Sequence, residues 1–289
     1  MAKKSGKTIL VTGATGQQGG AVLRRLREKG YSVRALTRDP NKPEARSLVG
    51  HGTEVVHGNL EDKASLARAL DGVDGVYSVQ TPMEQGVESE VRQGTNLIDA
   101  AKSFRIGLFV YSSAVSADKK TGLSFLESKF QIEERLRASG LPYTIVRPGF
   151  FMENLLQMRE GIQGGVFALP FKPDTRLQMI AVDDIGVLVT MAFERPGHWL
   201  GRAVELAGDE LSLSELASAF ARITGQEVQY RQVPWDEYEK QAGPDVTKLY
   251  RWLEEVGYHV DIPTLRQEHP NLMGFERWLQ TRWPKALAA

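Results

Sequence analysis

Short apolar runs alternate with amphipathic stretches of helical length from Lys7 to Arg147. The runs that we expect to be strands are residues 7–12, 32–37, 53–57, 74–79, 107–112 and 143–148. Alternating strands and helices are typical of parallel strands joined by crossover helices. The pattern therefore predicts an α/β fold with a doubly wound parallel sheet (Rossmann), in which functional residues follow the carboxyl ends of the strands.

The regular alternation ends after Phe150, where strand-like and helix-like segments are mixed. Residues 165–170 and 177–182 are typical of strands, whereas residues 212–225 and 245–257 are typical of helices. We expect an NAD(P)-binding Rossmann domain over residues 1–150 and a smaller C-terminal α+β substrate lobe over residues 151–289. Because the apolar segment 179–193 could return to the core of the first domain, this lobe is expected to belong partly to that core.

The first expected strand leads into the glycine-rich turn "TGATGQQGG", and residues 21–30 supply a helix after it. Its glycines are three residues apart, at Gly13, Gly16 and Gly19. The first permits a tight turn, the second lets a diphosphate approach the backbone, and the third lets the helix pack closely on the sheet. Amide hydrogens at the helix start, where the macrodipole attracts anions, come from Thr15, Gln17 and Gln18. An ordinary glycine turn is the alternative, but the strand–turn–helix context favours nucleotide binding.

The end of the second expected strand, "RALTRDP", bears on which dinucleotide binds. An acidic residue directly at the strand end would bind the ribose of NAD and repel a 2'-phosphate. Here Thr37 and Arg38 come first, and a guanidinium pairs with phosphate through two parallel hydrogen bonds. We therefore expect NADP, with NAD possible, because Asp39 could bind ribose or only cap the turn "DPN".

Composition narrows the remaining classes of function. The 36 lysines and arginines balance 36 aspartates and glutamates, so nucleic-acid binding is not expected. The chain has no cysteine. Its five histidines show no metal-ligand spacing, so we expect no bound metal; these histidines are His51, His57, His198, His259 and His269. Neither a signal peptide nor a membrane span is recognisable, and we expect a cytoplasmic protein.

The segment "LSFLESKF" combines a helix signal with an unusual pair of side chains. Ser124 followed by Glu127 matches a capping box, which puts Phe125 and Lys129 one turn apart on one helical face. That face is otherwise apolar, and a charge on it is costly unless something anionic or polar receives it. A ribose with a nearby phosphate would do so; alternatively, the lysine lays its stem on apolar surface with its ammonium in water.

Together these motifs resemble the NmrA-like family of atypical short-chain dehydrogenase/reductases, which is related to the isoflavone and phenylcoumaran benzylic ether reductases. The resemblance covers nearly the whole chain. Its motifs are "VTGATGQQGG", "LTRDPNK", "GNLED", "YSSA", "SKFQIEERLRASGLPYTIVRPGFFMEN" and "VDDIG". The glycine turn is shared widely, whereas the long segment ending in "RPGFFMEN" is more particular to this group.

The resemblance also implies further cofactor-binding residues. By position, Asn59 and Leu60 would lie against the adenine. The residues that follow the fourth strand, beside the phosphates and the nicotinamide ribose, would be Gln80, Thr81 and Pro82. The nicotinamide end would be lined by Arg92, Lys129, Phe151 and Asn154.

The chain departs from short-chain dehydrogenases at one position. These enzymes pair the lysine with a tyrosine four residues earlier and with a serine after the fifth strand. The serine is retained as Ser112 or Ser113 and the lysine as Lys129, but Phe125 occupies the place of the tyrosine. A positioned general acid contributes about 100- to 10,000-fold to rate, and phenylalanine cannot act as one.

The sequence favours the first of two functions and leaves the second as its alternative. The first is an NADP(H)-binding redox sensor that signals to a regulatory protein partner, as NmrA-like proteins resembling this one are thought to do. The second is an NAD(P)H-dependent oxidoreductase of quinones or other small aromatic substrates, with Lys129 as the catalytic base if the substrate is a benzylic ether.

The aromatic residues Phe150, Phe167, Phe171, Trp235 and Tyr238 could line a substrate pocket or belong to the core. The helix expected over residues 87–104 could be buried or dimer-forming, so a monomer and a homodimer both remain open.

Overall fold

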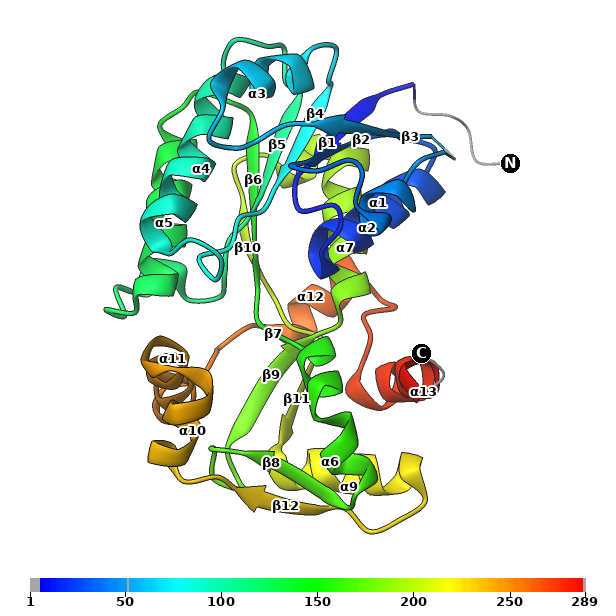
Figure 1. The fold of residues 1–289 in the computed structure, drawn as a ribbon, viewed down its shortest axis with the longest axis vertical. Coiled ribbons are helices and arrows are strands. Elements are labelled where there is room, and N and C mark those ends of the chain that lie inside the picture. Colours follow the sequence, from blue (N-terminus) through cyan, green and yellow to red (C-terminus); the bar gives the residue numbers. More distant parts are fainter. Residues whose placement is uncertain (1–5, 51, 288–289) are drawn as a thin grey trace. The chain divides into compact units, whose positions relative to one another are not determined.

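The computed structural model describes residues 6–50 and 52–287 (Figure 1), so the first five residues and His51 lie outside it. The chain divides into two compact units. The first contains the residues up to 147 together with residues 185–204, and the second contains residues 148–184 and 205 onward. Residues 185–204 thus belong to the first unit, while a single domain boundary after residue 150 stays a prediction.

The first unit is built on a seven-stranded sheet in the order β10-β6-β5-β4-β1-β2-β3. The strand pairs from β3 to β6 run parallel. The strands are β1 Thr8–Val11, β2 Ser32–Thr37, β3 Thr53–His57, β4 Gly75–Ser78, β5 Leu108–Ser112, β6 Tyr143–Pro148 and β10 Ala203–Leu206. This order confirms the predicted doubly wound α/β fold and adds β10, which the sequence pattern did not predict.

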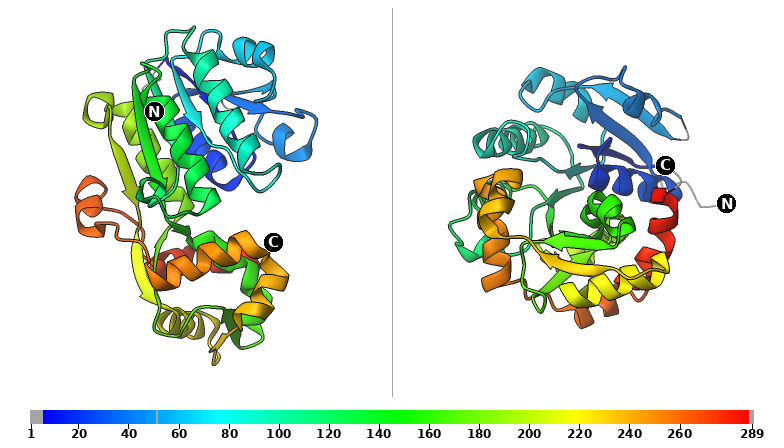
Figure 2. Two further views of the ribbon diagram at one scale, coloured as in Figure 1. Left: turned by 90° about the vertical axis from the view of Figure 1, so that its left-hand side faces the viewer. Right: turned by 60° about the horizontal axis from the view of Figure 1, so that its bottom comes forward.

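Helices cover both faces of this sheet (Figures 1 and 2). One face is covered by α1 Gln17–Glu28 and α7 Val182–Glu194, and the other by α3 Lys63–Leu70, α4 Val87–Ala101 and α5 Ser124–Arg137. Three short helices complete the unit: α2 Pro43–Arg46, η1 Ala117–Lys119 and α8 Pro196–Trp199. The α1 and α7 backbones come close, since a Cβ added to Gly186 would lie 2.7 Å from the carbonyl oxygen of Ala21.

The second unit is α+β, as predicted. It contains a three-stranded sheet in the order β11-β9-β7 and a two-stranded sheet of β12 and β8. Its strands are β7 Phe150–Phe151, β8 Val166–Leu169, β9 Arg176–Ile180, β11 Asp209–Ser212 and β12 Gln229–Gln232. Its helices are η2 Met152–Met158, α6 Arg159–Gln163, α9 Leu213–Thr224, α10 Trp235–Ala242, α11 Pro244–Glu255, α12 Ile262–Glu268 and α13 Phe275–Leu287.

Aromatic side chains dominate the core of the second unit. Of the five aromatic residues considered for a pocket, Phe150, Phe167 and Phe171 are buried in this core. Trp235 and Tyr238 remain partly exposed on α10, where the Trp235 ring meets Phe171 edge-on. The first three therefore serve packing, and only the two α10 rings present exposed aromatic surface.

Helix α5 begins at Ser124, as predicted, but the predicted capping box is wrong. Leu123 is the N-cap residue, and α5 has no side-chain cap hydrogen bond. Because Ser124 already lies in the first turn, Glu127 instead accepts a hydrogen bond from the backbone N–H of Gly122, at 3.1 Å. A complete capping box is present in α9, between Ser212 and Glu215.

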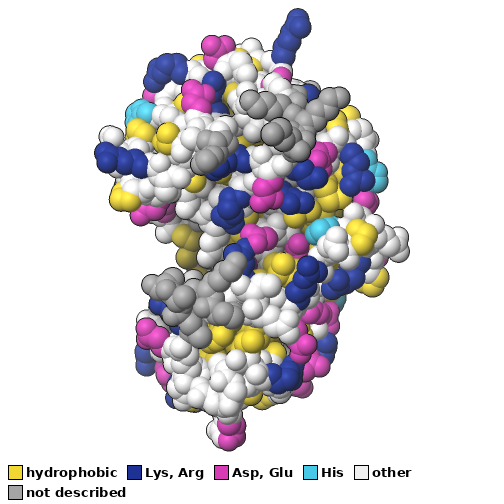
Figure 3. Space-filling view, turned by 90° about the vertical axis from the view of Figure 1, so that its right-hand side faces the viewer, with side chains coloured by type: hydrophobic (Ala, Val, Ile, Leu, Met, Phe, Trp, Pro, Cys, Tyr) yellow, Lys and Arg dark blue, Asp and Glu magenta, His cyan; other side chains and the backbone are white. Residues whose placement is uncertain are grey.

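Basic and acidic side chains lie interspersed on the face shown in Figure 3, in keeping with their equal numbers in the chain. Within residues 6–50 and 52–287, no helix is both long and apolar enough to cross a lipid bilayer. In the same residues, no three histidine, aspartate or glutamate side chains are grouped so as to hold a metal ion.

Candidate functional site

The glycine turn connects the carboxyl end of β1 to the first turn of α1. Gly13 has a φ of +59°, and its carbonyl oxygen accepts a hydrogen bond from the N–H of Gly16 at 2.9 Å. A Cβ at Gly19 would lie 2.2 Å from that same carbonyl oxygen. Gly16 is the N-cap of α1, which has no side-chain cap, so backbone N–H groups at the helix start are left for a ligand. This turn has the shape and the donors that a diphosphate needs.

Thr12 ties the glycine turn to the segment after β4. Its Oγ1 donates to the carbonyl oxygen of Val79 at 3.0 Å and accepts from the N–H of Val79 at 2.9 Å. A Cβ on Gly13 would lie 2.8 Å from Cγ1 of Val79. The turn and the end of β4 are therefore closely packed, which leaves no room for a larger residue at position 13.

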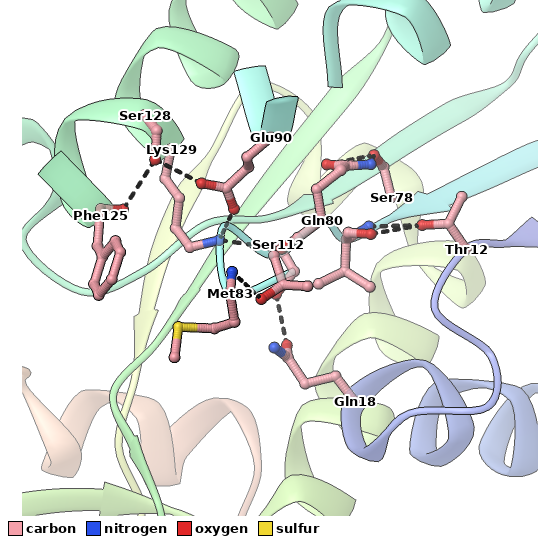
Figure 4. Close-up of polar contacts among 12 residues, drawn as sticks. Thr12, Gln18, Ser78, Gln80, Met83, Glu90, Ser112, Phe125, Ser128 and Lys129 are labelled. Carbon is pink, nitrogen blue, oxygen red and sulfur yellow. Dashed lines mark hydrogen bonds and ion pairs between the residues drawn. The ribbon is translucent and has the colours of Figure 1, made fainter. Parts of the chain in front are cut away.

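Gln18 connects α1 with Ser112 at the end of β5 (Figure 4), and it also contacts Tyr77 of β4. Its Oε1 accepts hydrogen bonds from Oγ of Ser112 at 2.7 Å and from the hydroxyl of Tyr77 at 3.3 Å. Burial raises the pKa of the Tyr77 phenol, and the Ser112 hydroxyl lowers it by less, so Tyr77 remains a donor at neutral pH. Of the two serines at the carboxyl end of β5, Ser112, the last residue of the strand, contacts Gln18 of α1, whereas the buried Ser113 hydroxyl has no hydrogen-bond partner within the described residues.

Arg38 pairs with a carboxylate of the chain itself. Its Nη1 lies 2.7 Å from Oε2 of Glu84, in the segment after β4, and both side chains are more than half exposed, at 60% and 55%. Asp39 forms the ordinary turn considered for it, because its Oδ1 accepts from the N–H of Asn41 at 2.9 Å. The guanidinium expected to bind phosphate is therefore present and solvent-accessible, with a competing anion beside it.

Lys129 forms an ion pair with Glu90 of α4 (Figure 4). The Lys129 Nζ donates to Oε1 of Glu90 at 2.7 Å and to the carbonyl oxygen of Gln80 at 3.4 Å. The other Glu90 oxygen accepts from Oγ of Ser128 at 2.5 Å. The Glu90 side chain is fully buried and that of Lys129 is 15% exposed. The anionic group that the sequence required for Lys129 is thus supplied by the protein, while ribose binding stays a prediction.

Phe125 lies one turn before Lys129 on α5, and its ring is half-buried. Its side chain and that of Lys129 leave the same side of the helix (Figure 4), as residues four apart do. The position therefore faces the region of Lys129, but it carries no hydroxyl to donate.

The residues expected near the adenine hold a local turn after β3. The Asn59 side chain accepts from the N–H of Glu61 at 3.0 Å, and the Leu60 carbonyl accepts from the Asn96 amide at 2.9 Å. Arg92 forms a two-pronged pair with Glu61, at 2.7 and 3.0 Å, which lowers the pKa of Glu61. Arg92 is thus held at Glu61, whereas Lys129 is held at Glu90.

The remaining predicted residues lie in two places. The segment after β4 is a compact turn, in which Thr81 Oγ1 accepts from the N–H of Met83 at 3.3 Å and the Pro82 carbonyl accepts from the N–H of Gly86 at 2.8 Å. Gln80 begins this turn, and its amide donates to Oγ of Ser78 at 2.9 Å. Phe151 and Asn154 belong to the second unit, in β7 and η2.

Sequence reasoning missed the carboxylates that pair with predicted site residues: Glu61 with Arg92, Glu84 with Arg38 and Glu90 with Lys129. For Glu90 a signal was present, because it continues the buried stripe of α4, which is formed by Gly94, Leu97, Ile98 and Ala101. An acid on the apolar stripe of one helix and a lysine on that of the next form a matched pair. Glu84 lies in an irregular segment and gave no such signal.

Comparison with known proteins places the chain among NAD(P)H-linked relatives. A sequence model described as the NmrA-like family matches residues 5–279. An NAD(P)H azoreductase of Xenophilus azovorans is 34% identical over 224 residues, which cover 77% of this chain and 76% of that protein. The NADPH-dependent quinone oxidoreductase of Escherichia coli, solved with NADPH, has a TM-score of 0.79 and 26% identity over 95% of this chain and 99% of that one.

A likeness to a regulator is seen in the fold. NmrA, a negative transcriptional regulator solved in complex with NADP, has a TM-score of 0.79 and covers 94% of both chains. Its identity is 23%, so this likeness concerns the fold alone.

Proposed function

The chain belongs to the NmrA-like family, and from this premise we propose that it binds NADP(H) and acts as an NADPH-dependent reductase of quinones or other aromatic acceptors. The observation that carries the proposal is the glycine turn, which opens on the uncapped start of α1. The 34% identity to an azoreductase and the likeness to a quinone oxidoreductase support a reductase.

The dinucleotide's diphosphate would bind the backbone N–H groups at the start of α1. Arg38 would bind the 2'-phosphate of NADP, after exchanging the Glu84 carboxylate for it. The other contacts are proposed from the family likeness and involve Asn59, Leu60, Gln80, Thr81, Pro82, Arg92, Lys129, Phe151 and Asn154.

The side chains around Lys129 suit an acceptor that needs no protein acid. When bound, NADPH would supply the hydride, and with it the two electrons, that reduce a quinone; a proton from water would complete the hydroquinone. Phe125 offers no proton, but a hydroquinone anion is a far weaker base than an alkoxide and needs none from the protein. Ether cleavage with Lys129 as a base is less favoured, because the Lys129 Nζ is engaged by the Glu90 carboxylate at 2.7 Å.

Redox sensing is the second candidate function. It is supported by the same Phe125, since a site without a proton donor can bind dinucleotide and leave simple carbonyls unreduced. The oxidised and reduced cofactors differ by one charge, and a sensor requires unequal affinity or a change of shape between them. Such a protein would pass this difference to a regulatory partner.

Two measurements separate these functions. Calorimetric titration with NADPH, NADP+, NADH and NAD+ measures binding, and NADPH absorbance in the presence of quinones and azo dyes measures turnover. We expect NADPH binding and quinone turnover. NADPH binding without turnover of any acceptor would exclude the reductase and leave redox sensing as the function. Failure to bind any of the four dinucleotides would exclude both functions.

The preference for NADP is tested by two variants with opposite expectations. In Arg38→Gln, NADPH affinity should fall about 10- to 100-fold relative to NADH, because a charge-assisted phosphate contact is lost. In Glu84→Gln it should rise about two- to fivefold, since an exposed ion pair no longer competes. Glu54→Gln is the matched control, because it removes an exposed carboxylate that pairs with Arg34 instead. An equal loss of NADPH and NADH affinity in Arg38→Gln would contradict the role of Arg38.

A further inference from the structure

We propose that Glu90 is a positioning residue that sets the preference of this site between oxidised and reduced dinucleotide, by holding Lys129 and cancelling its charge. The inference rests on the proposed dinucleotide binding and adds to it a residue that decides redox-form specificity. It is carried by a carboxylate that is fully buried and yet completely paired.

Both oxygens of Glu90 are fixed by donors from α5. One accepts from Ser128 Oγ at 2.5 Å and the other from Lys129 Nζ at 2.7 Å. Two bonds to the two oxygens of one carboxylate restrict its orientation, and with it the position of the Lys129 ammonium. Lys129 is also bonded to the carbonyl oxygen of Gln80 at 3.4 Å, so within the described residues two of its three hydrogens are used. The third remains for a ribose hydroxyl.

The pair has no net charge, and this affects the two forms of the cofactor differently. The nicotinamide ring carries a positive charge when it is oxidised and none when it is reduced. Beside a neutral pair, the charged ring meets little repulsion. Without the carboxylate, the ammonium of Lys129 would stand alone and would disfavour the oxidised ring. Without the ammonium, the carboxylate would stand alone and would favour it.

Glu133 provides a matched control on α5. Its side chain is also fully buried, and it pairs with Arg147 at 2.7 and 2.9 Å and with Arg137 at 2.8 Å. Glu133→Gln therefore breaks a buried ion pair of the first unit but leaves the Glu90–Lys129 pair intact. A merely structural role of Glu90 would make Glu90→Gln and Glu133→Gln behave alike toward the two cofactor forms.

The test is the ratio of the dissociation constants for NADP+ and NADPH, measured by calorimetry on the full chain. We expect the ratio to rise about tenfold in Glu90→Gln and to fall by a similar factor in Lys129→Met. The double variant should return toward the wild-type ratio, because both charges are gone. Glu133→Gln should stay within about twofold of it. If Lys129→Met also loses a contact with the ribose, the binding of NADP+ and that of NADPH are weakened equally, and this effect cancels in the ratio.

Two results would overturn the inference. An unchanged ratio in folded Glu90→Gln and Lys129→Met, with circular dichroism like that of the wild type, would remove the electrostatic role while leaving dinucleotide binding in place. Wild-type protein that binds neither form would instead remove the proposed function and this inference with it. If Glu90→Gln does not fold, Lys129→Met carries the test, and the double variant, which leaves neither an unpaired ammonium nor an unpaired buried carboxylate, is its control for folding.

Discussion

Phe125 and Lys129 lie one turn apart on α5, and only one of them can take part in proton chemistry. Lys129 is fixed as a donor to Glu90, and Phe125 presents a hydrocarbon edge. A dehydrogenase acting on simple carbonyls needs a hydroxyl at position 125 to protonate the alkoxide. At the scale of single residues, the lack of a hydroxyl at position 125 is what the proposed preference for acceptors with a weakly basic reduced form rests on.

Phe125→Tyr should create or raise NADPH-dependent reduction of simple carbonyls, because it adds a hydroxyl one turn before Lys129. We expect an increase of at least about tenfold, within the range of roughly 100- to 10,000-fold that general acid catalysis can reach. The loss of NADPH absorbance with an aldehyde or ketone measures it. Phe130→Tyr is the control, since Phe130 is half-buried on the same helix and packs against Arg137. Wild-type rates in Phe125→Tyr would mean that the missing hydroxyl does not limit carbonyl reduction.

At the scale of elements, the packing of α1 on the glycine turn depends on the close approach of the Gly19 backbone to the backbone of Thr12 and Gly13. A Cβ at Gly19 would meet the carbonyl oxygens of Gly13 at 2.2 Å and of Thr12 at 2.7 Å, so α1 would have to move away from the turn. At Gly20, the nearest atoms to an added Cβ are 3.4 Å away. Two adjacent buried glycines of one helix therefore differ in what they tolerate.

Gly19→Ala should lower the free energy of unfolding by about 1–3 kcal/mol, the usual cost of overpacking, and weaken dinucleotide binding at least about tenfold. Gly20→Ala should leave binding unchanged and keep or raise stability by up to about 1 kcal/mol, because alanine is the better helix former. Urea unfolding and calorimetric titration measure both variants. Equal effects of the two substitutions would show that the close approach at Gly19 does not matter.

The same elements explain how far the sequence was informative. The strands from β1 to β6 were predicted because each is a short run with several apolar residues, bounded by turns. β10 was missed because its four residues, from Ala203 to Leu206, are mostly half-exposed and form no such run. The N-cap of α5 was mispredicted because a local motif cannot show that Leu123, and not Ser124, ends the preceding loop. Glu90 depends on the pairing of α4 with α5, which only the tertiary structure supplies.

At the scale of the whole molecule, the free energy of unfolding at neutral pH includes contributions from carboxylates whose charged form is stabilised by hydrogen bonds. In the first unit, the hydrogen bond from Arg92 lowers the pKa of Glu61. In the second, backbone hydrogen bonds lower the pKa of Glu215, at the start of α9, and of Asp261, at the start of α12. Since acids and bases are equal in number, net repulsion is small at neutral pH, and these local hydrogen bonds contribute to the loss of stability in acid.

The free energy of unfolding should therefore fall as the pH drops below about 4.5. A group whose folded pKa is depressed contributes stability above its unfolded pKa, here 4.5 for Glu61 and Glu215, and loses it as the pH falls through the folded value. Urea unfolding of wild type, Glu61→Gln and Glu215→Gln across a pH series measures this. Both variants should be less stable than wild type at neutral pH, and the difference should vanish in acid, because the wild-type carboxylates are then protonated too. A difference that stays constant with pH would mean that packing, and not the charge of these carboxylates, makes the contribution.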